Sequence, residues 1–405
     1  MSGQQLTRES EEFLEDLAEE LSVPESRYEQ AERSYKALGE WLHRDASRVR
    51  QFDPKVYVQG SFRLSTTIRP LNETEEYDVD SVCELQKLSK TSLTQKQLKD
   101  LLGIEIEAYR KAKNMTKPLR EGRRCWVLDY AEDAQFHMDI VPAVPNSQSA
   151  RILLETYGLD TKWTQTAIAI TDNEGPFYTV LTDDWPRSNP KGYSEWFKSR
   201  MAAILERRRR LVAEAKRAKV EDIPDYRVRT PLQAAVMILK RHRDYSFANR
   251  KDVRPISVII TTLAAHAYGG EETIGQALTS ILLGMDKHIL WHNNRYWIPN
   301  PTDPLENFAD KWFEHPERAQ AFYQWLARAR AEFAEAARSH DKKLITETVA
   351  RGVGGGVADR AARRRQSPAA SSLLRAAAVA PAGAGLSFPD KGRVPTKPKG
   401  FGAIE

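Results

Sequence analysis

Residues 56–85, VYVQGSFRLSTTIRPLNETEEYDVDSVCEL, decide the fold, because a strand-like run, a small-residue turn and a second strand with two acidic residues follow one another there. Asp78 and Asp80 lie two apart, and alternate residues of a strand face the same side, so both carboxylates should share one face. Like charges this close repel, and the pair makes physical sense when a divalent cation lies between them. The stretch therefore predicts a strand that carries a cation site.

A third acidic residue, Asp139, lies in QFHMDIVPAV (135–144), where apolar and polar residues alternate. Two acidic residues also occur on plain surface strands, so the third favours a metal site over that interpretation. Three carboxylates on neighbouring strands suit two Mg²⁺ ions, with Mn²⁺ as a possible substitute, one activating a hydroxyl and one bound to a triphosphate. We interpret His137 as a structural neighbour of this site.

The turn at Gly60 and Ser61 follows directly on the strand-like run that ends at Gln59. Glycine lets a backbone approach a phosphate closely, and exposed amides and a serine hydroxyl can donate to its oxygens. A Gly-Ser turn alone is nearly uninformative. Followed by two carboxylates and a later third, it predicts a nucleotide-binding turn made by Gln59, Gly60 and Ser61.

Composition restricts the class of protein. At 405 residues the chain allows two to three domains of about 150 residues each. Only two cysteines, Cys83 and Cys125, are present, which excludes a disulfide framework and a cysteine-rich zinc site. The sequence has no apolar run of about 18 residues and no signal-peptide pattern at its acidic start, so we expect a cytoplasmic protein without membrane contact.

Charge is unevenly distributed along the chain. The net charge is +5, but residues 351–405 hold seven Arg and three Lys against two Asp and one Glu, a balance of +7, so the first 350 residues sum to −2. A body with this charge is not a basic nucleic-acid-binding domain, and nucleic acid is not expected as a partner. The basic run Arg207 to Arg210 has no interleaved aromatics and is interpreted as a solvated helix face.

The first half of the chain mixes strand and helix patterns. Strand patterns occur at residues 56–59, 77–85, 124–130 and 135–141, the last two joined by a polar connection at 131–134. A helix start with a capping serine is predicted at Ser22, and a helical pattern covers about 93–112.

From residue 193 onward the pattern is helical, and after about 350 the composition becomes rich in Gly, Ala, Arg and Pro. We therefore predict an α+β fold with three parts: a first lobe with an N-terminal helix at 1–192, a helical lobe at 193–349, and a flexible basic tail at 350–405. The GVGGGV run (352–357) is interpreted as a linker.

The motifs QGSFRLSTTIRP (59–70), EYDVDSV (76–82) and FHMDIVPAV (136–144) together resemble the nucleotidyltransferase superfamily related to DNA polymerase β. Within it the chain is most similar to the bacterial cyclic-oligonucleotide synthases, or CD-NTases, which are related to cyclic GMP-AMP synthase and oligoadenylate synthase. The resemblance covers about residues 20–345 through further segments at 187–197, 230–247, 254–268 and 300–312. It implies a nucleotidyltransferase lobe, a helical lobe like the oligoadenylate synthase C-terminal domain, and an active site between them.

The resemblance also implies roles for single residues. Gly60 and Ser61 would hold the donor phosphates, Asp78 and Asp80 would bind both metal ions, and Asp139 would bind the ion that activates the acceptor hydroxyl. Many relatives have Gly-Thr shortly after the Gly-Ser turn, where this chain has Ser65-Thr66. That departure concerns the loop after the turn and not the metal site.

Four residues of the second half match further nucleotide contacts of the family. Lys240 matches a lysine that reaches the triphosphate, although its charged surroundings also fit a solvated helix face. Ser257 matches a second phosphate contact, or is a plain helix cap after Pro255. Asn189 and Tyr193 match base-recognising positions, or form a turn and a packed aromatic.

The implied activity is the joining of ATP and GTP into a cyclic di- or trinucleotide with release of pyrophosphate, with a cyclic GMP-AMP-like product as the first expectation. Family members act in bacterial antiphage signalling. Some are conjugated or regulated through the C-terminus, which makes the end KPKGFGAIE a possible partner-binding segment. The alternatives are a transferase acting on an RNA end or a small molecule, and a nucleotide-binding scaffold without catalysis.

Overall fold

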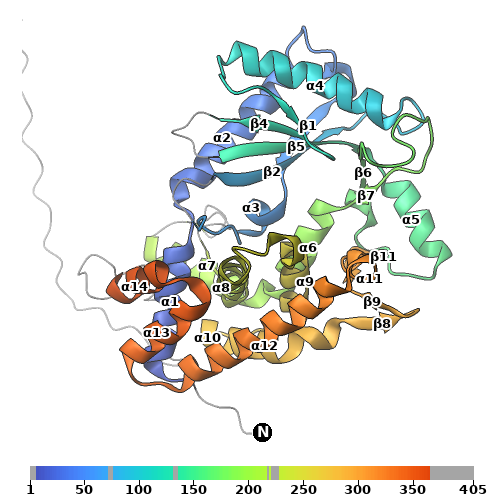
Figure 1. The fold of residues 1–405 in the computed structure, drawn as a ribbon. Coiled ribbons are helices and arrows are strands. Elements are labelled where there is room, and N and C mark those ends of the chain that lie inside the picture. Colours follow the sequence, from blue (N-terminus) through green and yellow to red (C-terminus); the bar gives the residue numbers. More distant parts are fainter. Residues whose placement is uncertain (1–5, 72–75, 131–135, 217–218, 220–227, 365–405) are drawn as a thin grey trace, which may run out of the picture.

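The computed structural model describes residues 6–71, 76–130, 136–216, 219 and 228–364, which form two lobes on either side of a cleft (Figure 1). One lobe is built on a mixed sheet and the other is helical. The predicted α+β class is therefore confirmed.

The sheet has seven strands. Its main path runs β1-β2-β5-β4-β3, and β6 pairs with both β5 and β7. The strands are β1 Pro54–Val58, β2 Tyr77–Leu85, β3 Arg120–Glu121, β4 Trp126–Asp129, β5 Phe136–Pro145, β6 Ile168–Ile170 and β7 Arg187–Ser188. β2 and β5 are parallel, and the other pairs are antiparallel. The four strand patterns of the sequence are confirmed, 77–85 with unchanged bounds and the other three with shifted ends, while the connection at 131–134 lies outside the described residues.

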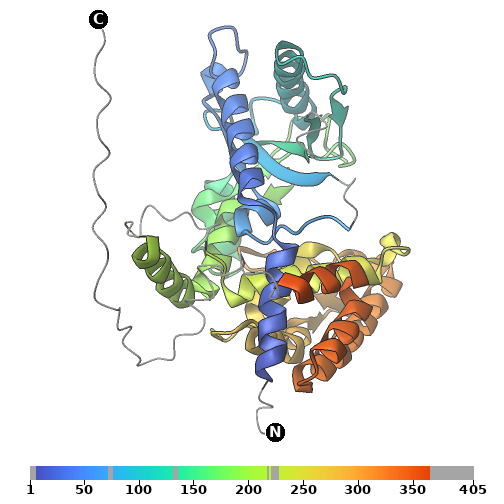
Figure 2. The same cartoon turned by 90° about the vertical axis from the view of Figure 1, so that its left-hand side faces the viewer.

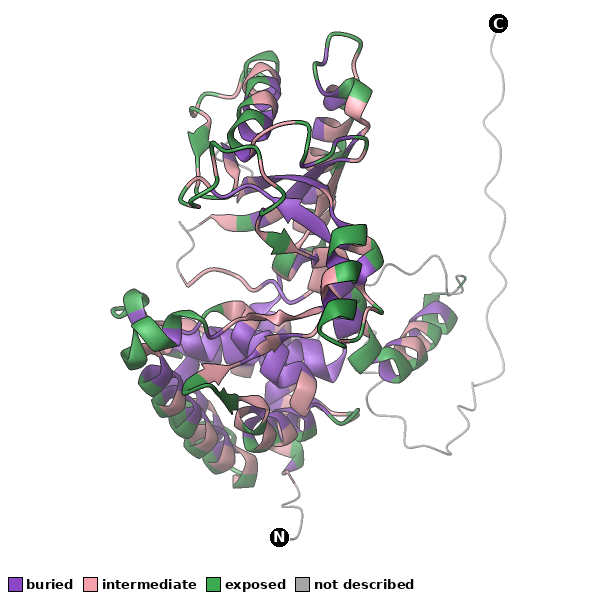
Figure 3. Cartoon of the chain, turned by 90° about the vertical axis from the view of Figure 1, so that its right-hand side faces the viewer, coloured by how far each residue is buried: buried purple, intermediate pink, exposed green. Residues whose placement is uncertain are grey.

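The two faces of the sheet differ because strand residues alternate. One face packs under α2 (Glu25–Leu42) and α4 (Gln95–Ala112), where Val79 and Met138 join a buried apolar cluster (Figures 1 and 3). Val82 and Val141 belong to a separate apolar cluster on the opposite face. Asp80 and Asp139 precede these two valines by two residues, so they lie on that second face.

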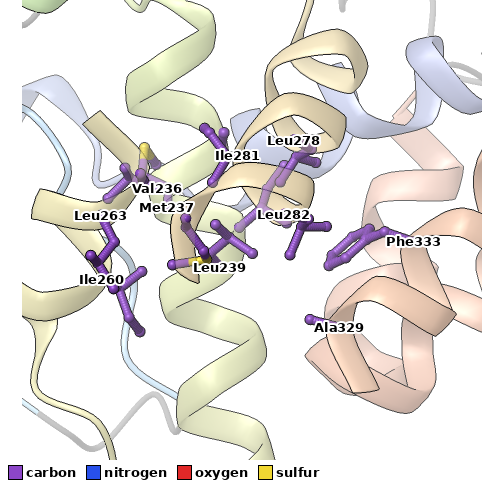
Figure 4. Close-up of a cluster of buried hydrophobic side chains, with 14 of the residues drawn as sticks. Val236, Met237, Leu239, Ile260, Leu263, Leu278, Ile281, Leu282, Ala329 and Phe333 are labelled. Carbon is purple, nitrogen blue, oxygen red and sulfur yellow. The ribbon is translucent and has the colours of Figure 1, made fainter. Parts of the chain in front are cut away.

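The helical lobe is organised around α8 (Pro231–Ser246), whose residues are buried from Pro231 to Arg243. Thr230 caps this helix in a reciprocal pair with Gln233, and Pro231 occupies the first turn. Figure 4 shows side chains of α8 meeting those of α9 (Ser257–Ala267), α10 (Ile274–Gly284) and α12 (Pro316–Arg338). Although α8 is buried, it carries charged residues at its C-terminal end, of which Lys240, Arg243 and Asp244 line the cleft.

Shorter elements connect and complete the lobes. Helices α5, α6 and α7 lead from the sheet to the helical lobe, and two hairpins with a short helix precede α12. Their bounds are α5 Ser147–Thr156, α6 Pro190–Arg200, α7 Ala202–Lys216, β8 Leu290–His292, β9 Arg295–Trp297, β10 Pro299–Asn300, β11 Asp303–Asn307 and α11 Lys311–Glu314. None of the helices in the described ranges is long and apolar enough to cross a membrane.

The N-terminal region corrects two expectations. Helix α1 (Arg8–Leu21) precedes α2 and packs into the apolar core of the helical lobe, although the first lobe was predicted to begin at residue 1 (Figure 2). Ser22 does not cap α2, because its hydroxyl donates to the carbonyl of Ala18 at 2.6 Å and so closes the end of α1. Pro24 precedes α2 without a side-chain cap.

The C-terminal region corrects the predicted start of the tail. Helix α13 (Lys342–Val353) runs into the GVGGGV segment, Gly354 has a φ of 95°, and α14 (Gly355–Arg364) follows. Ala358 and Ala361 of α14 are fully buried, and α14 lies against α1. Small residues pack closely here. Residues 355–364 were predicted to be part of a flexible tail because they contain few large apolar residues. The end KPKGFGAIE lies outside the described residues.

Candidate active site

The cleft between the lobes has a volume of about 1140 Å³. Residues of α3 (Gly60–Leu64), the loop after it and β2 line one wall, and residues of α8, α9 and β11 line the other. The lining includes all but one of the residues that the sequence nominated: Gln59, Gly60, Ser61, Asp78, Asp80, Asn189, Tyr193, Lys240 and Ser257. The remaining residue, Asp139, lies beside Asp80.

The three aspartates occupy adjacent strands. Asp80 and Asp139 are direct partners in the parallel pairing of β2 with β5, and Asp78 pairs with His137 in the same register. The side chain of Asp78 is 73% exposed, whereas that of Asp139 is 28% exposed. Burial, followed by the charges of Asp139 and Asp78, raises the pKa of Asp80 to about 7. Burial also raises the pKa of Asp139. The carboxylates thus form a crowded cluster that a cation would stabilise.

His137 lies among these carboxylates. Its Nε2 is 3.1 Å from Oδ1 of Asp78 and 3.7 Å from Oδ1 of Asp139, and its Nδ1 is 3.5 Å from Glu76. The hydrogen bond to Asp78 is the main cause that raises the pKa of His137 to about 9. The imidazolium therefore balances part of the negative charge that gathers at this end of β2 and β5.

A group with metal-ligating atoms within 4.8 Å of one another is found in the described part of the chain, and it consists of Glu76, Asp129 and His137. Asp129 is already paired with Arg120, which donates to both of its oxygens at 3.1 Å. The sequence did not single out Glu76 or Asp129, since neither belongs to the alternating pattern of the three aspartates.

One buried atom tests whether the three aspartates fit a divalent cation. Oδ1 of Asp139 is buried and has no hydrogen-bond partner within the described ranges. Buried polar atoms are nearly always paired, and the nearest cationic group, Nε2 of His137, is 3.7 Å away, so this atom is open to a ligand. A carboxylate oxygen next to further carboxylates is the donor type that Mg²⁺ takes. The residues of this site therefore fit the cation.

Gly60 brings the backbone of α3 against Asp80. Its φ is 59°, and a Cβ at this position would lie 2.4 Å from Oδ2 of Asp80, a distance that only glycine allows. The amide of Gln59 donates to the carbonyl of Asp80 at 2.8 Å. The predicted Gly-Ser turn is thus the first turn of a five-residue helix. The backbone of this turn therefore lies directly against the Asp80 carboxylate.

Lys240 and Ser257 face this helix from the helical lobe. The Nζ of Lys240 donates to the carbonyl of Thr66 at 2.9 Å, and burial, then Arg243, lowers the pKa of Lys240 to about 8. Lys240 is only 6% exposed, so the solvated-face interpretation is wrong. Ser257 is the first residue of α9 and Ile256 is the cap, so the plain-cap interpretation is wrong as well. The hydroxyl of Ser257 accepts from Arg243 at 2.7 Å.

Asn189 and Tyr193 have internal partners. The Oδ1 of Asn189 accepts from the Gly192 amide at 2.9 Å and caps α6, while its Nδ2 donates to the carbonyl of Trp163 at 2.7 Å. The hydroxyl of Tyr193 and that of Thr262 lie 2.7 Å apart. The amide of Asn189 is therefore engaged in the fold, whereas the half-buried ring of Tyr193 lines the cleft.

The charged residues of the cleft that the sequence did not nominate include Arg63, Arg69, Arg243, Arg254 and Glu306. Arg243 is buried and paired with Asp244 at 2.6 Å, and Arg254 is 3.5 Å from the same Asp244 oxygen. Arg243 could have been found as the residue three positions after Lys240 on one helix face. No periodicity marks Glu306, because its strand β11 has five half-buried residues without alternation.

Comparisons with known proteins agree with this geometry. Residues 54–142 match the family model of the nucleotidyltransferase domain of cyclic GMP-AMP synthase DncV-like proteins. A c-di-GMP synthase of Roseivirga ehrenbergii is 27% identical over 332 residues, which cover 82% of this chain and 80% of that protein. The cyclic dinucleotide synthase CdnG of Bradyrhizobium diazoefficiens is 25% identical over 358 residues, which cover 82% of this chain and 76% of CdnG.

Solved structures share the two-lobed fold. The CD-NTase CdnG of Bradyrhizobium diazoefficiens in complex with GTP superposes with a TM-score of 0.64 at 20% identity, covering 88% of this chain and 99% of that one. Vibrio cholerae DncV in complex with the linear intermediate 5′ pppA(3′,5′)pG has a TM-score of 0.51 at 13% identity. The match covers 87% of this chain and 88% of the DncV chain. The matched domain and the relatives aligned over most of the chain identify the protein as a nucleotidyltransferase, similar in sequence to cyclic dinucleotide synthases and in fold to the bacterial CD-NTases.

Proposed function

We propose that the protein joins two nucleoside triphosphates, at least one of them GTP, into a cyclic dinucleotide. The observation that carries the proposal is the in-register pair Asp80 and Asp139 beneath Gly60, at the base of a cleft of about 1140 Å³. Pockets for one drug-sized ligand span about 300–1,000 Å³, so this cleft has room for a donor and an acceptor nucleotide.

In this proposal both walls of the cleft bind the donor phosphates. The first turn of α3 binds donor phosphates through its amides and the Ser61 hydroxyl, and Lys240 approaches the same phosphates from α8. Asp78, Asp80 and Asp139 would hold Mg²⁺, which supplies charge neutralisation and hydroxyl activation when bound. The residues contribute position and electrostatics and form no covalent intermediate.

The bond changes are those of two successive transfers. An acceptor hydroxyl attacks the donor α-phosphate in line, a new P–O bond forms, the α–β P–O bond breaks, and the hydroxyl proton is lost as pyrophosphate leaves. The linear product then presents its own triphosphate to the same carboxylates. A second attack of the same kind closes the ring.

Base choice is proposed from Glu306. One of its oxygens accepts from Asn300 at 2.6 Å, and Glu306 lines the cleft. A carboxylate can accept from both N–H groups on the Watson–Crick edge of guanine, whereas adenine offers one donor beside an acceptor. The names of the two relatives, a c-di-GMP synthase and CdnG, also favour guanine. Cyclic GMP-AMP, the first expectation from the sequence, stays a prediction.

The Glu306→Gln variant tests this base choice. We expect the preference for GTP over ATP, measured as the ratio of kcat/KM values, to fall about tenfold, because an amide cannot accept from both guanine donors. Glu314→Gln is the matched control, since Glu314 is exposed and pairs with Lys311 outside the cleft. An unchanged preference in Glu306→Gln would remove Glu306 from base recognition.

The activity itself is tested with the purified full-length protein, Mg²⁺ and each labelled triphosphate, singly and in pairs. After phosphatase treatment we expect a resistant product by mass analysis, formed from GTP alone if the ring is c-di-GMP and only from GTP with ATP if it is mixed. EDTA should abolish the product and Mn²⁺ should restore it. Elongation of an added RNA end would instead support the transferase alternative, and nucleotide binding without turnover would support the scaffold.

A role in antiphage signalling, with conjugation or regulation through the C-terminus, is proposed on the family resemblance. The correction of the tail changes its test, because residues 350–364 belong to the helical lobe. Removing only residues 365–405 should abolish conjugation and defence in cells while turnover in vitro remains. Unchanged conjugation and defence would refute this role of the segment.

A further inference from the structure

An ion cluster joins the two ends of the described chain. Glu20, near the end of α1, is 7% exposed and faces two arginines of α14: Nε of Arg360 at 2.6 Å and Nη1 of Arg364 at 3.3 Å. Arg69 approaches the same carboxylate at 3.9 Å. Figure 2 shows α14 lying across α1 below the point where α1 meets α2. The buried Glu20 carboxylate thus pairs with three arginines: Arg360 and Arg364 of α14, and Arg69 from a separate segment.

Arg69 belongs to the loop that follows α3 and lines the cleft (65–71). Its Nε donates to the carbonyl of Ser22 at 2.7 Å, and its amide donates to the carbonyl of Leu21 at 2.9 Å. Arg241 of α8 donates to the carbonyls of Arg69 and Pro70. The far end of the cleft loop is therefore attached to the junction of α1 with α2.

The near end of the same loop contacts the proposed phosphate site. The hydroxyl of Thr67 donates to that of Ser61 at 3.0 Å, and the amide of Thr66 donates to the carbonyl of Ser61 at 2.9 Å. Thr66 also accepts from Lys240. Residues 66–69 thus connect the ion cluster at Glu20 with both proposed phosphate-binding groups.

We infer that Glu20 is a positioning residue for nucleotide binding: it anchors Arg69 and, with the arginines of α14, holds the cleft loop in the conformation that presents Ser61 and Lys240. The inference rests on the proposed function, since it concerns the same nucleotide site. It also gives α14, the helix directly before residues 365–405, an influence on that site.

The charges of this cluster explain why loss of the Glu20 anion should weaken nucleotide binding. Replacing Glu20 by Gln keeps the shape and removes the anion, so the guanidinium groups of Arg69, Arg360 and Arg364 would repel one another. Arg69 is 41% exposed and can turn toward solvent, which would break its side-chain bond to the Ser22 carbonyl and loosen the loop, leaving its backbone bond to Leu21 and the bonds from Arg241 to hold it. The cluster touches neither the aspartates nor the reacting phosphate. Loss of the anion should therefore weaken binding and leave the chemical step unchanged.

The test measures KM and kcat for GTP with full-length Glu20→Gln and with the double variant Arg360→Gln/Arg364→Gln. For both we expect KM to rise roughly three- to tenfold with kcat unchanged, the size of coupling through a contact network, because the first variant loses the anion and the second loses the two closest partners that fix the Glu20 carboxylate beside Arg69. Titration calorimetry with GTP and Mg²⁺ should show the same loss of affinity. Glu19→Gln is the matched control, because Glu19 pairs with Arg229 at 3.3 Å and with Arg364 at 4.0 Å but not with Arg69. Its KM should equal that of the wild type.

The outcomes separate this inference from the proposed function. A wild type that neither binds nor turns over GTP refutes the proposed function. A wild type that is active, with Glu20→Gln showing an unchanged KM, refutes only the positioning role. A fall in kcat at unchanged KM, with a lower melting temperature, would mean that Glu20 is merely structural. An unchanged KM in the double arginine variant would exclude an influence of α14 on the nucleotide site.

Discussion

Asp80→Asn is expected to lower cyclic dinucleotide formation by about 10³-fold or more while leaving the metal-free protein at least as stable as the wild type. The loss follows because a metal-held transition state is stabilised by several kcal/mol, and each 1.36 kcal/mol is a factor of ten in rate. Stability should not fall, because the Asp80 carboxylate is buried beside Asp139 and Asp78, and a neutral amide removes that repulsion.

Turnover and melting temperature, each in EDTA and in Mg²⁺ with GTP, check both parts of this prediction. Ligand binding stabilises the folded state, so Mg²⁺ with GTP should raise the melting temperature of the wild type and not that of Asp80→Asn. Asp100→Asn is the control, because Asp100 is exposed, pairs with Lys96 and does not line the cleft. A variant that loses stability and activity together would show that Asp80 supports the fold rather than the metal.

The site was predictable from the sequence where strand periodicity determines geometry. The alternation in EYDVDSV and FHMDIV places Asp78, Asp80 and Asp139 on one face of the sheet, and the parallel register then brings Asp80 beside Asp139. Local spacing, however, carries no information on partners more than 100 residues away. The contact of Lys240 with Thr66 needed the folded lobes.

The predicted Ser22 cap and the predicted start of the tail at residue 350 were wrong for a similar reason, because local sequence does not show which distant segments pack against it. Ser22 followed by Pro24 and Glu25 has the composition of a helix start, but the preceding helix α1 uses its hydroxyl. Residues 350–364 lack large apolar side chains, yet Ala358 and Ala361 are buried because α1 lies close enough to cover small residues. In both places tertiary packing outweighed local composition.

Gly60→Ala is expected to lower turnover by about 100-fold or more, because the new Cβ would lie 2.4 Å from Oδ2 of Asp80 and one of the two must move. A displacement of about 1 Å at a reacting centre costs about 100-fold in rate. The φ of 59° adds a backbone cost of roughly 1–2 kcal/mol in the free energy of unfolding, since it is a left-handed conformation.

Gly158→Ala separates these two effects. Gly158 has a φ of 65°, but a Cβ there would meet no atom within 4 Å. Both variants should therefore lose free energy of unfolding through the backbone cost in denaturant titrations, Gly60→Ala at least as much as Gly158→Ala, and only Gly60→Ala should lose turnover. Equal turnover in the two variants would mean that the amides of α3 need not approach Asp80 closely. Selective loss in Gly60→Ala would establish that the phosphate-binding turn and the metal-binding carboxylate work as one unit, because the two glycines share their backbone strain and differ in the contact with Asp80.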